Sequence, residues 1–282
     1  MVSDERPGTQ NDPYWYDFLT KGDATERRLR RIFRHIPYGP RCKLCAAPFN
    51  GPGAPIMRVL GSRPSDKNPN VCTRCFTYLA DHHGGAEIEA SMMFADIRGS
   101  TSLAERMSTA EFHAILDRFY VAATKAVFDN DGSLDKFVGD EVVAFFFPNF
   151  VGQDHAAAAI SAATDLLRAT GHEEAGGPWV PVGAGVATGI VWAGAVGTGA
   201  QTDITAIGDT VNTTARLASA AKAGEVLVTT EAARQAGLDP HLETRTLDLK
   251  GKAAGTEVVT LNIGPQAGAI SWRDRAPGAG RR

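Results

Sequence analysis

The sequence predicts an α+β protein with a mixed β-sheet, preceded by a small module that contains all four cysteines. Strand-like and helix-like runs alternate along residues 86–263, a pattern typical of a sheet covered by helices. Two of the strand-like runs, 134–138 and 141–147, are separated by a short turn and predict an antiparallel hairpin. The cysteines all precede residue 86, which sets their module apart from this region.

Helices are predicted where apolar residues recur at helical spacing next to capping signals. Ser108 and Glu111 have the spacing of a capping box, and Asn-Asp-Gly at 130–132 ends the helix that follows. Further helices are predicted at 102–107, 155–170 and 210–221. The remaining strands are predicted at 87–96, 204–207, 225–229, 243–249 and 257–261, with two paired strands within 180–196.

The composition is that of an ordinary soluble globular protein: 282 residues, 43% hydrophobic and 22% charged. This length allows one large or two modest domains. The formal net charge of −3 argues against a protein built mainly to bind nucleic acid. Residues 1–13 are polar and lack the apolar core of a secretory signal, so a cytoplasmic location is expected.

The run 176–202 carries no charged residue and is long enough to suggest a membrane span. It also contains prolines and many glycines, and its valines favour two strands that meet at a turn. We therefore expect no transmembrane segment.

The predicted organisation has four parts. Residues 1–22 are expected to form a loose N-terminal arm, and 264–282 a disordered tail rich in Gly, Ala and Arg. Residues 23–85 would contain a basic helix and the four-cysteine module (residues 38–85), with Gly84-Gly85 as the boundary. Residues 86–263 would form the main domain.

The basic helix is predicted from Ala24 to Pro37, with an apolar stripe beneath five arginines. Such a helix could contact an anionic membrane or nucleic acid. We prefer the alternative in which the stripe packs on the cysteine module or a partner chain while the arginines stay solvated.

The cysteines form two Cys-x-x-Cys pairs, Cys42/Cys45 and Cys72/Cys75. Two thiolates on a tight turn can bind one metal ion, and two such turns complete a tetrahedral site. In a cytosolic protein this pattern favours metal over disulfide, with structural zinc preferred and iron or an iron–sulfur cluster as the alternative.

Two carboxylates, Asp96 and Asp140, each follow a strand-like run at a turn. Mg²⁺ prefers oxygen ligands, usually one or two carboxylates together with substrate phosphates. A single Asp at the end of a strand is more often a turn residue. The prediction of a metal site therefore depends on both aspartates occurring in this order, followed by the motifs described below.

With these motifs, residues 86–263 resemble the catalytic domain of class III nucleotide cyclases of the adenylyl cyclase type. The resemblance implies a ferredoxin-like mixed sheet with helices, and two domains in a head-to-tail homodimer with active sites at the interface. Asp96 and Asp140 match the family's aspartates for two Mg²⁺ or Mn²⁺ ions, and Ile97 would add its backbone carbonyl.

The resemblance also implies which residues bind ATP. Lys136 and Thr205 match the positions that contact the purine, and this combination indicates adenine. Asn212 would position the ribose, Arg216 would stabilise charge on the α-phosphate, and Lys252 would bind the terminal phosphates.

The implied reaction forms cyclic AMP and pyrophosphate by a two-metal mechanism, in which the ions activate the ribose 3′-hydroxyl and bind the phosphates. Gln201 departs from the family, because many bacterial relatives have a basic phosphate contact near this position.

Two other functions remain open. A diguanylate or guanylyl cyclase has a related fold, but Asn212, Arg216 and Lys252 have no role in the diguanylate enzyme. The other alternative is a catalytically degenerate cyclase fold that serves as a zinc-binding dimerisation and signalling module. The upstream regulator is not encoded in any recognisable motif.

Overall fold

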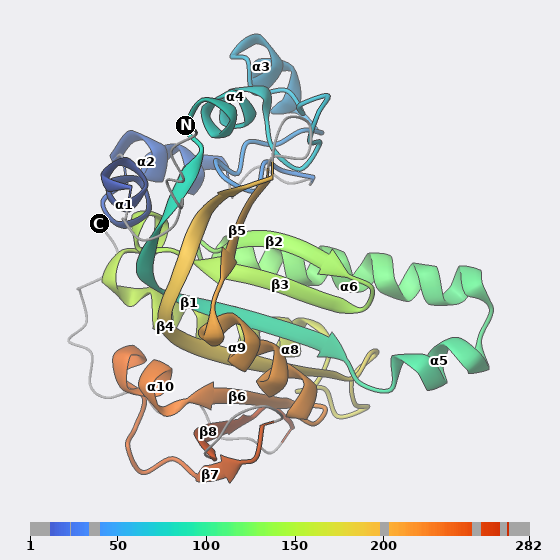
Figure 1. The fold of residues 1–282 in the computed structure, drawn as a ribbon. Coiled ribbons are helices and arrows are strands. Elements are labelled where there is room, and N and C mark those ends of the chain that lie inside the picture. The colour runs from blue at the N-terminus through green and yellow to red at the C-terminus, as the bar shows by residue number, and fades with distance from the viewer. Residues whose placement is uncertain are drawn as a thin grey trace, which may run out of the picture.

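The structure is a computed structural model that describes residues 12–22, 24–33, 40–197, 203–249, 255–265 and 270. At its centre is a sheet with strand order β2-β3-β1-β4-β6-β8-β7, and β5 pairs with β4 outside this path (Figure 1). The β4–β6 pair is parallel and the other pairs are antiparallel, so the predicted α+β fold with a mixed sheet is confirmed. The strands are β1 (Gly84–Ile97), β2 (Ser133–Val138), β3 (Glu141–Phe146), β4 (Val182–Val196), β5 (Asp203–Ile207), β6 (Glu225–Thr229), β7 (Thr244–Leu247) and β8 (Thr256–Asn262).

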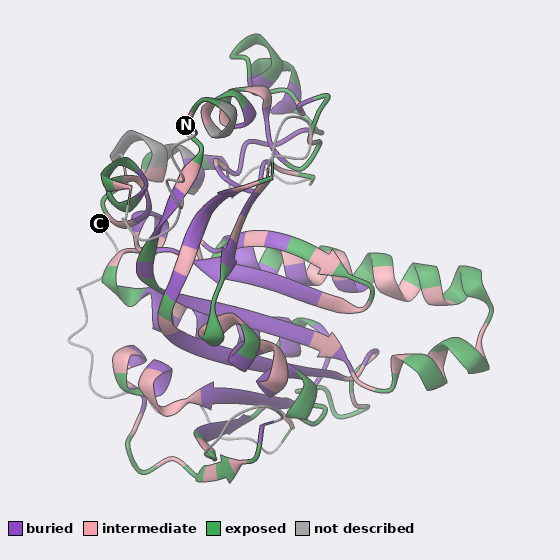
Figure 2. Ribbon diagram, in the orientation of Figure 1, coloured by how far each residue is buried: buried purple, intermediate pink, exposed green. Residues whose placement is uncertain are grey.

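Strand β1 is buried on both faces over most of its length, as Figure 2 shows, which explains its nearly continuous apolar sequence. Met93 and Ala95 point into one hydrophobic cluster, here called the helix-side core. Met92 and Phe94 point into a second cluster on the opposite face, here called the module-side core. Asp96 continues this second row at the end of the strand.

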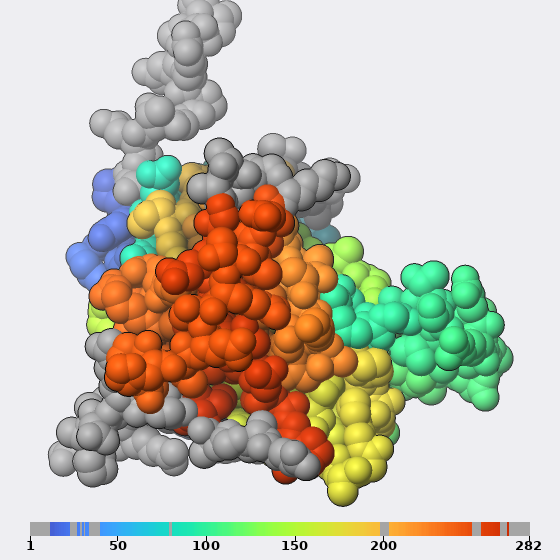
Figure 3. All heavy atoms as spheres, turned by 90° about the horizontal axis from the view of Figure 1, so that it is seen from below, coloured from blue at the N-terminus to red at the C-terminus, as the bar shows by residue number. Residues whose placement is uncertain are grey.

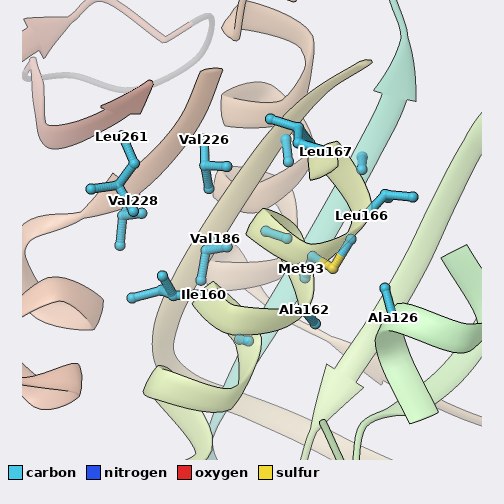
Figure 4. Packing of buried hydrophobic residues seen from close by; sticks show 14 of the residues in the cluster. Met93, Ala126, Ile160, Ala162, Leu166, Leu167, Val186, Val226, Val228 and Leu261 are labelled. Carbon is cyan, nitrogen blue, oxygen red and sulfur yellow. The ribbon is translucent and has the colours of Figure 1, made fainter. Parts of the chain in front are cut away.

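Three helices cover the helix-side core: α6 (Thr109–Asp129), α8 (His155–Ala169) and α10 (Thr230–Ala236). In Figure 4, Ile160 of α8 lies beside Val186 of β4, and Leu167 of α8 belongs to the same cluster. The predicted capping box is confirmed at the start of α6, where the Ser108 and Glu111 side chains each bind the other's backbone N–H. Helix α10 was not predicted.

Helix α9 (Asp209–Ala220) lies on the module side of the sheet, directly against β4. A Cβ atom at Gly185 would lie 2.5 Å from the backbone nitrogen of Ala218, and one at Gly183 would lie 2.8 Å from the carbonyl oxygen of Ala221. The glycines in this run therefore let a helix approach the strand closely. The prediction of two paired strands in 180–196 is wrong, because β4 is one uninterrupted strand.

The N-terminal arm is not loose in the part that the structure describes. Helix α1 (Pro13–Thr20) begins with an Asp12 cap, and its Trp15 and Leu19 are fully buried in the module-side core. The Trp15 indole N–H donates to the carbonyl of His82 at 3.1 Å. Two large buried apolar side chains outweigh the polar composition of this segment.

The basic helix is observed as α2 (Ala24–Phe33), while residues 34–39, including the predicted end of the helix, lie outside the described residues. Phe33 is buried, but Ile32 is 59% exposed, so the apolar stripe is only partly used. The expectation that the arginines stay solvated is wrong for Arg30, which is 3% exposed. Its guanidinium donates to the carbonyl of Gly132 at 2.9 Å and stacks over the Phe150 ring at 3.8 Å.

The cysteine module adds α3 (Ala54–Val59) and α4 (Thr73–Asp81), and it packs on the sheet rather than standing apart (Figure 1). Leu44 and Phe76 of the module share the module-side core with Phe145 of β3. Gly84 and Gly85, the expected boundary, are the first residues of β1. Module and catalytic domain therefore have one common core.

The remaining elements close the ends of the sheet. Helix α5 (Ser100–Arg106) and the start of α6 project from one end, as Figure 3 shows, and the short helix α7 (Pro148–Val151) follows β3. Strand β7, paired with β8, forms the far edge of the sheet. Among the described residues, no helix has both the length and the apolar character needed to cross a membrane. Most of the predicted tail, 264–282, lies outside the described residues.

Candidate active site and cysteine cluster

The two predicted metal carboxylates meet where β1 ends and the β2–β3 hairpin turns. Asp96 lies opposite Glu141 in the β1–β3 ladder, and Asp140 is in the turn just before Glu141. Gly139 adopts a φ of +62°, a left-handed conformation that glycine accepts without strain. The Ile97 N–H donates to the carbonyl of Asp140 at 3.3 Å, which fixes the hairpin tip beside the end of β1.

These carboxylates create a site of concentrated negative charge. Burial, together with the adjacent Asp140 carboxylate, raises the pKa of Asp96 to about 6 even though Arg98 opposes the shift. Burial and the charges of Asp96 and Asp140 also raise the pKa of Glu141. Arg98 forms an ion pair with Asp96 and donates to the carbonyl of Ser219 at 2.9 Å. Sequence reasoning missed this counter-ion, although it stands two residues after Asp96.

The donor set suits a divalent cation. Half-buried carboxylate oxygens beside backbone carbonyls are the ligands that Mg²⁺ and Mn²⁺ prefer. A bound cation would also favour the ionised form of Asp96, which burial disfavours. Asp96, Asp140 and the Ile97 carbonyl are therefore the groups that would hold the ions.

The raised pKa of Asp96 leads to a pH-dependence prediction. Below about pH 6 a proton must leave Asp96 before a cation binds, so Mn²⁺ affinity should fall about tenfold per pH unit there and be flat above it. In the metal-free protein, stability associated with this group should be lost as pH rises through about 6, because its folded pKa exceeds the unfolded value. Calorimetric Mn²⁺ titrations between about pH 5 and about pH 8 measure the first effect, and a pH-independent affinity would contradict it.

The two predicted purine contacts are brought together by a residue that sequence reasoning did not single out, Asp135. Lys136 Nζ lies 3.2 Å from Asp135 Oδ2, and the Thr205 hydroxyl donates to the same oxygen at 3.2 Å. A β-bulge between Leu134 and Lys136 turns the Asp135 carboxylate inward, where it is 2% exposed, and leaves the Lys136 side chain 49% exposed. A bulge is not visible in a hydrophobic pattern.

Helix α9 presents Asn212 and Arg216 one turn apart, Asn212 exposed and Arg216 half-buried. Within the described part of the chain, no hydrogen bond or ion pair involves the Arg216 guanidinium. Lys252 and Gln201 lie outside the described residues.

The four cysteines converge on one point. Their sulfur atoms all lie within 4.8 Å of one another, and Cys45 Sγ is 3.8 Å from Cys72 Sγ. A tetrahedral zinc site with Zn–S bonds of about 2.3 Å requires sulfur–sulfur distances of about 3.8 Å. The spacing therefore fits one tetrahedral ion and is too long for a disulfide.

The surrounding backbone has the arrangement of a metal site. The Cys72 N–H points at Cys42 Sγ at 3.3 Å, and the Cys75 N–H points at Cys72 Sγ at 3.5 Å. Without an ion, hydrogen bonds from the thiols of Cys42, Cys45 and Cys75 hold the pKa of Cys72 well below its usual range, while hydrogen bonds within the same cluster raise the pKa values of Cys45 and Cys75. Ala46, just after the first pair, has a φ of +58°, so the loop keeps a left-handed turn without glycine.

Removing one ligand should remove the metal. We expect Cys72→Ser to lower the bound metal severalfold and to destabilise the fold by about 2 kcal/mol or more, a fall in Tm of about 4–8 °C. The destabilisation should be global because the module shares the core of the sheet. Elemental analysis measures the bound metal, and calorimetry measures Tm. Arg74→Ala, which changes an exposed residue of α4, is the control and should keep both values. Full metal content in Cys72→Ser would contradict the site.

Comparisons with known proteins agree with this geometry. The sequence profile of the Adenylate and Guanylate cyclase catalytic domain matches residues 86–260. An adenylate cyclase of Anabaena cylindrica is 31% identical over 173 residues, which are 59% of this chain and 34% of that protein. An uncharacterized protein of Mycobacterium tuberculosis strain H37Rv is 37% identical over 142 residues, 49% of this chain and 25% of that protein. The chain thus spans about a third or less of these relatives.

Solved structures show the same fold. The guanylyl cyclase Cya2 superposes with a TM-score of 0.58 at 24% identity, covering 67% of this chain and 99% of that one. The adenylyl cyclase CyaB from P. aeruginosa superposes with a TM-score of 0.55 at 27% identity, covering 63% of this chain and 95% of that one. These likenesses and the profile match cover the sheet that carries the paired carboxylates, Lys136, Thr205 and α9. The chain therefore belongs to the adenylate and guanylate cyclase catalytic domain family.

Proposed function

We propose that this nucleotide cyclase converts ATP to 3′,5′-cyclic AMP and pyrophosphate, and that it works as a homodimer. The observation that carries the choice of ATP is the convergence of Lys136 and Thr205 on one oxygen of Asp135. Guanylyl cyclases are among the similar structures, so base selection depends on these side chains.

The hydrogen-bond directions favour adenine. The Thr205 hydroxyl donates its single hydrogen to Asp135, so its lone pairs are left to accept from the exocyclic amine of adenine. The Lys136 ammonium has donors left for adenine N1, which is an acceptor. Guanine reverses both groups, presenting an acceptor at O6 and a donor at N1. Both contacts would then be mismatched, and unpaired polar groups at a buried base are costly.

The remaining roles follow from the carboxylates and α9. When bound, the divalent ions supply Lewis acidity to the ribose 3′-hydroxyl and the phosphates. Asp96 and Asp140 hold the ions, Asn212 orients the ribose, and Arg216 places positive charge where the α-phosphate gains negative charge. Lys252 would bind the departing pyrophosphate.

A homodimer is supported by the exposed apolar residues next to the site. Val138, Ile190 and Ile207 are 56%, 59% and 54% exposed, on the strands β2, β4 and β5. Exposed large aliphatic side chains on the strands of Lys136 and Thr205, and on β4 beside β5, are typical of an interface. We propose that a second copy of the chain covers them.

For the cysteine cluster we propose a structural zinc ion. The sulfur spacing, the N–H···S bonds and the shared core support a role in folding. Mild reductants should then leave activity unchanged. Visible absorbance with redox-dependent activity would indicate an iron centre instead.

Turnover of the purified chain with ATP and with GTP, each in Mg²⁺ and in Mn²⁺, tests the proposed reaction. Cyclic AMP should form with kcat/KM at least about tenfold above that for cyclic GMP, the discrimination expected from two mismatched hydrogen bonds. Preferred formation of cyclic GMP would overturn the choice of substrate. Absence of either product would favour the degenerate signalling module.

A further inference from the structure

Lys43 lies between the metal-binding cysteines Cys42 and Cys45, yet its side chain reaches out of the module into the sheet. It is 4% exposed, and its ammonium lies 3.1 Å from Asp135 Oδ1 and 2.6 Å from Asp203 Oδ1. It also donates to the carbonyl of Ile204 at 2.8 Å. A lysine is rarely buried unless its ammonium is paired in this way, so the groups from β2 and β5 determine where the Lys43 ammonium lies.

Asp135 therefore connects the two sites. Its Oδ1 binds Lys43, and its Oδ2 binds both Lys136 and Thr205. Asp203, the other partner of Lys43, begins β5, the strand that carries Thr205. One ammonium from the cysteine module thus holds both strands on which the proposed purine contacts stand.

The backbone of Lys43 contacts both the loop of the second cysteine pair and the sheet. Its N–H donates to the carbonyl of Asn70 at 2.9 Å, in the loop that leads to Cys72. Its carbonyl accepts a hydrogen bond from the Ser133 hydroxyl at the start of β2. Cys72 in turn donates its N–H to Cys42 Sγ. Loss of an ion bound by the four sulfurs would let the two cysteine loops move relative to each other, and it would weaken the Asn70 contact that orients Lys43.

Without Lys43, the 2%-exposed Asp135 carboxylate would keep only Lys136 and Thr205 as partners. The remaining cation, Lys136, would be drawn toward the buried charge, because an uncompensated buried carboxylate is costly. Lys136 would then be less available to the purine. Among the described residues, the contacts of the Lys43 ammonium do not include Asp96 or Asp140, so kcat should change less than affinity for the purine.

We propose that Lys43 is a positioning residue through which the four-cysteine site sets purine binding and base selection at Lys136 and Thr205. The proposal rests on the proposed cyclase function and adds a regulatory consequence: metal at the cysteines controls nucleotide affinity. An ion that only stabilised the fold would not act selectively on the base.

The first test compares Lys43→Met with Ser133→Ala, which removes a bond between module and sheet but leaves the ammonium in place. Lys43→Met should raise KM for ATP about tenfold, change kcat less than about threefold and reduce the preference for ATP over GTP. Adding Asp135→Asn should recover part of the lost affinity, because it removes the uncompensated charge. Ser133→Ala should lower Tm only. A fall in kcat at unchanged KM and unchanged preference in Lys43→Met would overturn the proposal.

The second test uses the unaltered chain and does not depend on the folding of a variant. Zinc is stripped with a chelator, its loss is measured, and Mg²⁺ is restored before assay. KM for ATP should rise as in Lys43→Met, and readdition of Zn²⁺ should reverse it. Unchanged KM and base preference in the stripped protein would contradict the coupling.

A readout without turnover separates this proposal from the proposed reaction. Hydrogen exchange at the amides of β2 and β5 should increase more than at those of β6 and β8 on zinc removal and in Lys43→Met, even if neither ATP nor GTP is converted. Failure of turnover with this exchange response would reject the reaction and keep the linkage. Unchanged exchange in both strands would reject the linkage.

Discussion

Asp96→Ala is expected to lower kcat/KM for cyclic AMP formation by about three orders of magnitude or more, since the loss of metal charge at the reacting phosphate is worth several kcal/mol. The chain should still fold. Burial disfavours the ionised form of Asp96, whose pKa is raised to about 6, so removing the carboxylate does not remove a stabilising charge at neutral pH. Only the ion pair with Arg98 is lost, and Arg98 keeps its bonds to backbone carbonyls.

Two measurements test this expectation together: initial rates, and Tm with and without Mn²⁺. The unaltered chain should gain thermal stability with Mn²⁺ through binding to the folded state, whereas Asp96→Ala should not. Glu105→Ala, on the exposed face of α5, is the matched control and should behave like the unaltered chain. Activity within about tenfold of normal in Asp96→Ala would refute the assignment of this carboxylate to the metal site.

The sequence predicted most of the sheet because its strands are buried on one or both faces, and burial is what hydrophobic patterns report. The pairing of β2 with β3 followed from a short turn, and it places Asp140 beside the end of β1. The same reasoning failed for β4, where glycine marks the close approach of α9 rather than a turn. A glycine in a strand can mark a turn or the close approach of another element, and the local sequence does not show which of the two applies.

The polar contacts between distant segments could not be predicted from the sequence either. Arg30 and Lys43 are basic residues, and the expected location for such residues is the surface. Both are buried because carbonyls or carboxylates from β2, the turn before it, and β5 surround them. Asp135 was overlooked beside Lys136 because only the bulge in β2 turns it inward.

Arg216→Ala carries the second large expected effect. The guanidinium is half-buried on α9 with no ion pair among the described residues, so its charge is available to a phosphate. Its loss should lower kcat about a hundredfold to a thousandfold with little change in KM, as for a group that acts mainly in the transition state. Initial rates over a range of ATP concentrations measure both constants. A rise in KM of the same size at unchanged kcat would assign Arg216 to ground-state binding instead.

The same variant tests the dimer. If Asp96 of one subunit and Arg216 of the partner subunit complete one active site, a dimer of one Asp96→Ala chain and one Arg216→Ala chain has both changes in one site and none in the other. In an equal mixture about half of the dimers are mixed, and each has one intact site of two, so activity should recover to about a quarter of normal. Each variant alone stays inactive at the same total concentration, which is the internal control. Failure to recover in a mixture shown to exchange subunits would mean that Asp96 and Arg216 act within one chain, and it would contradict the proposed shared active site.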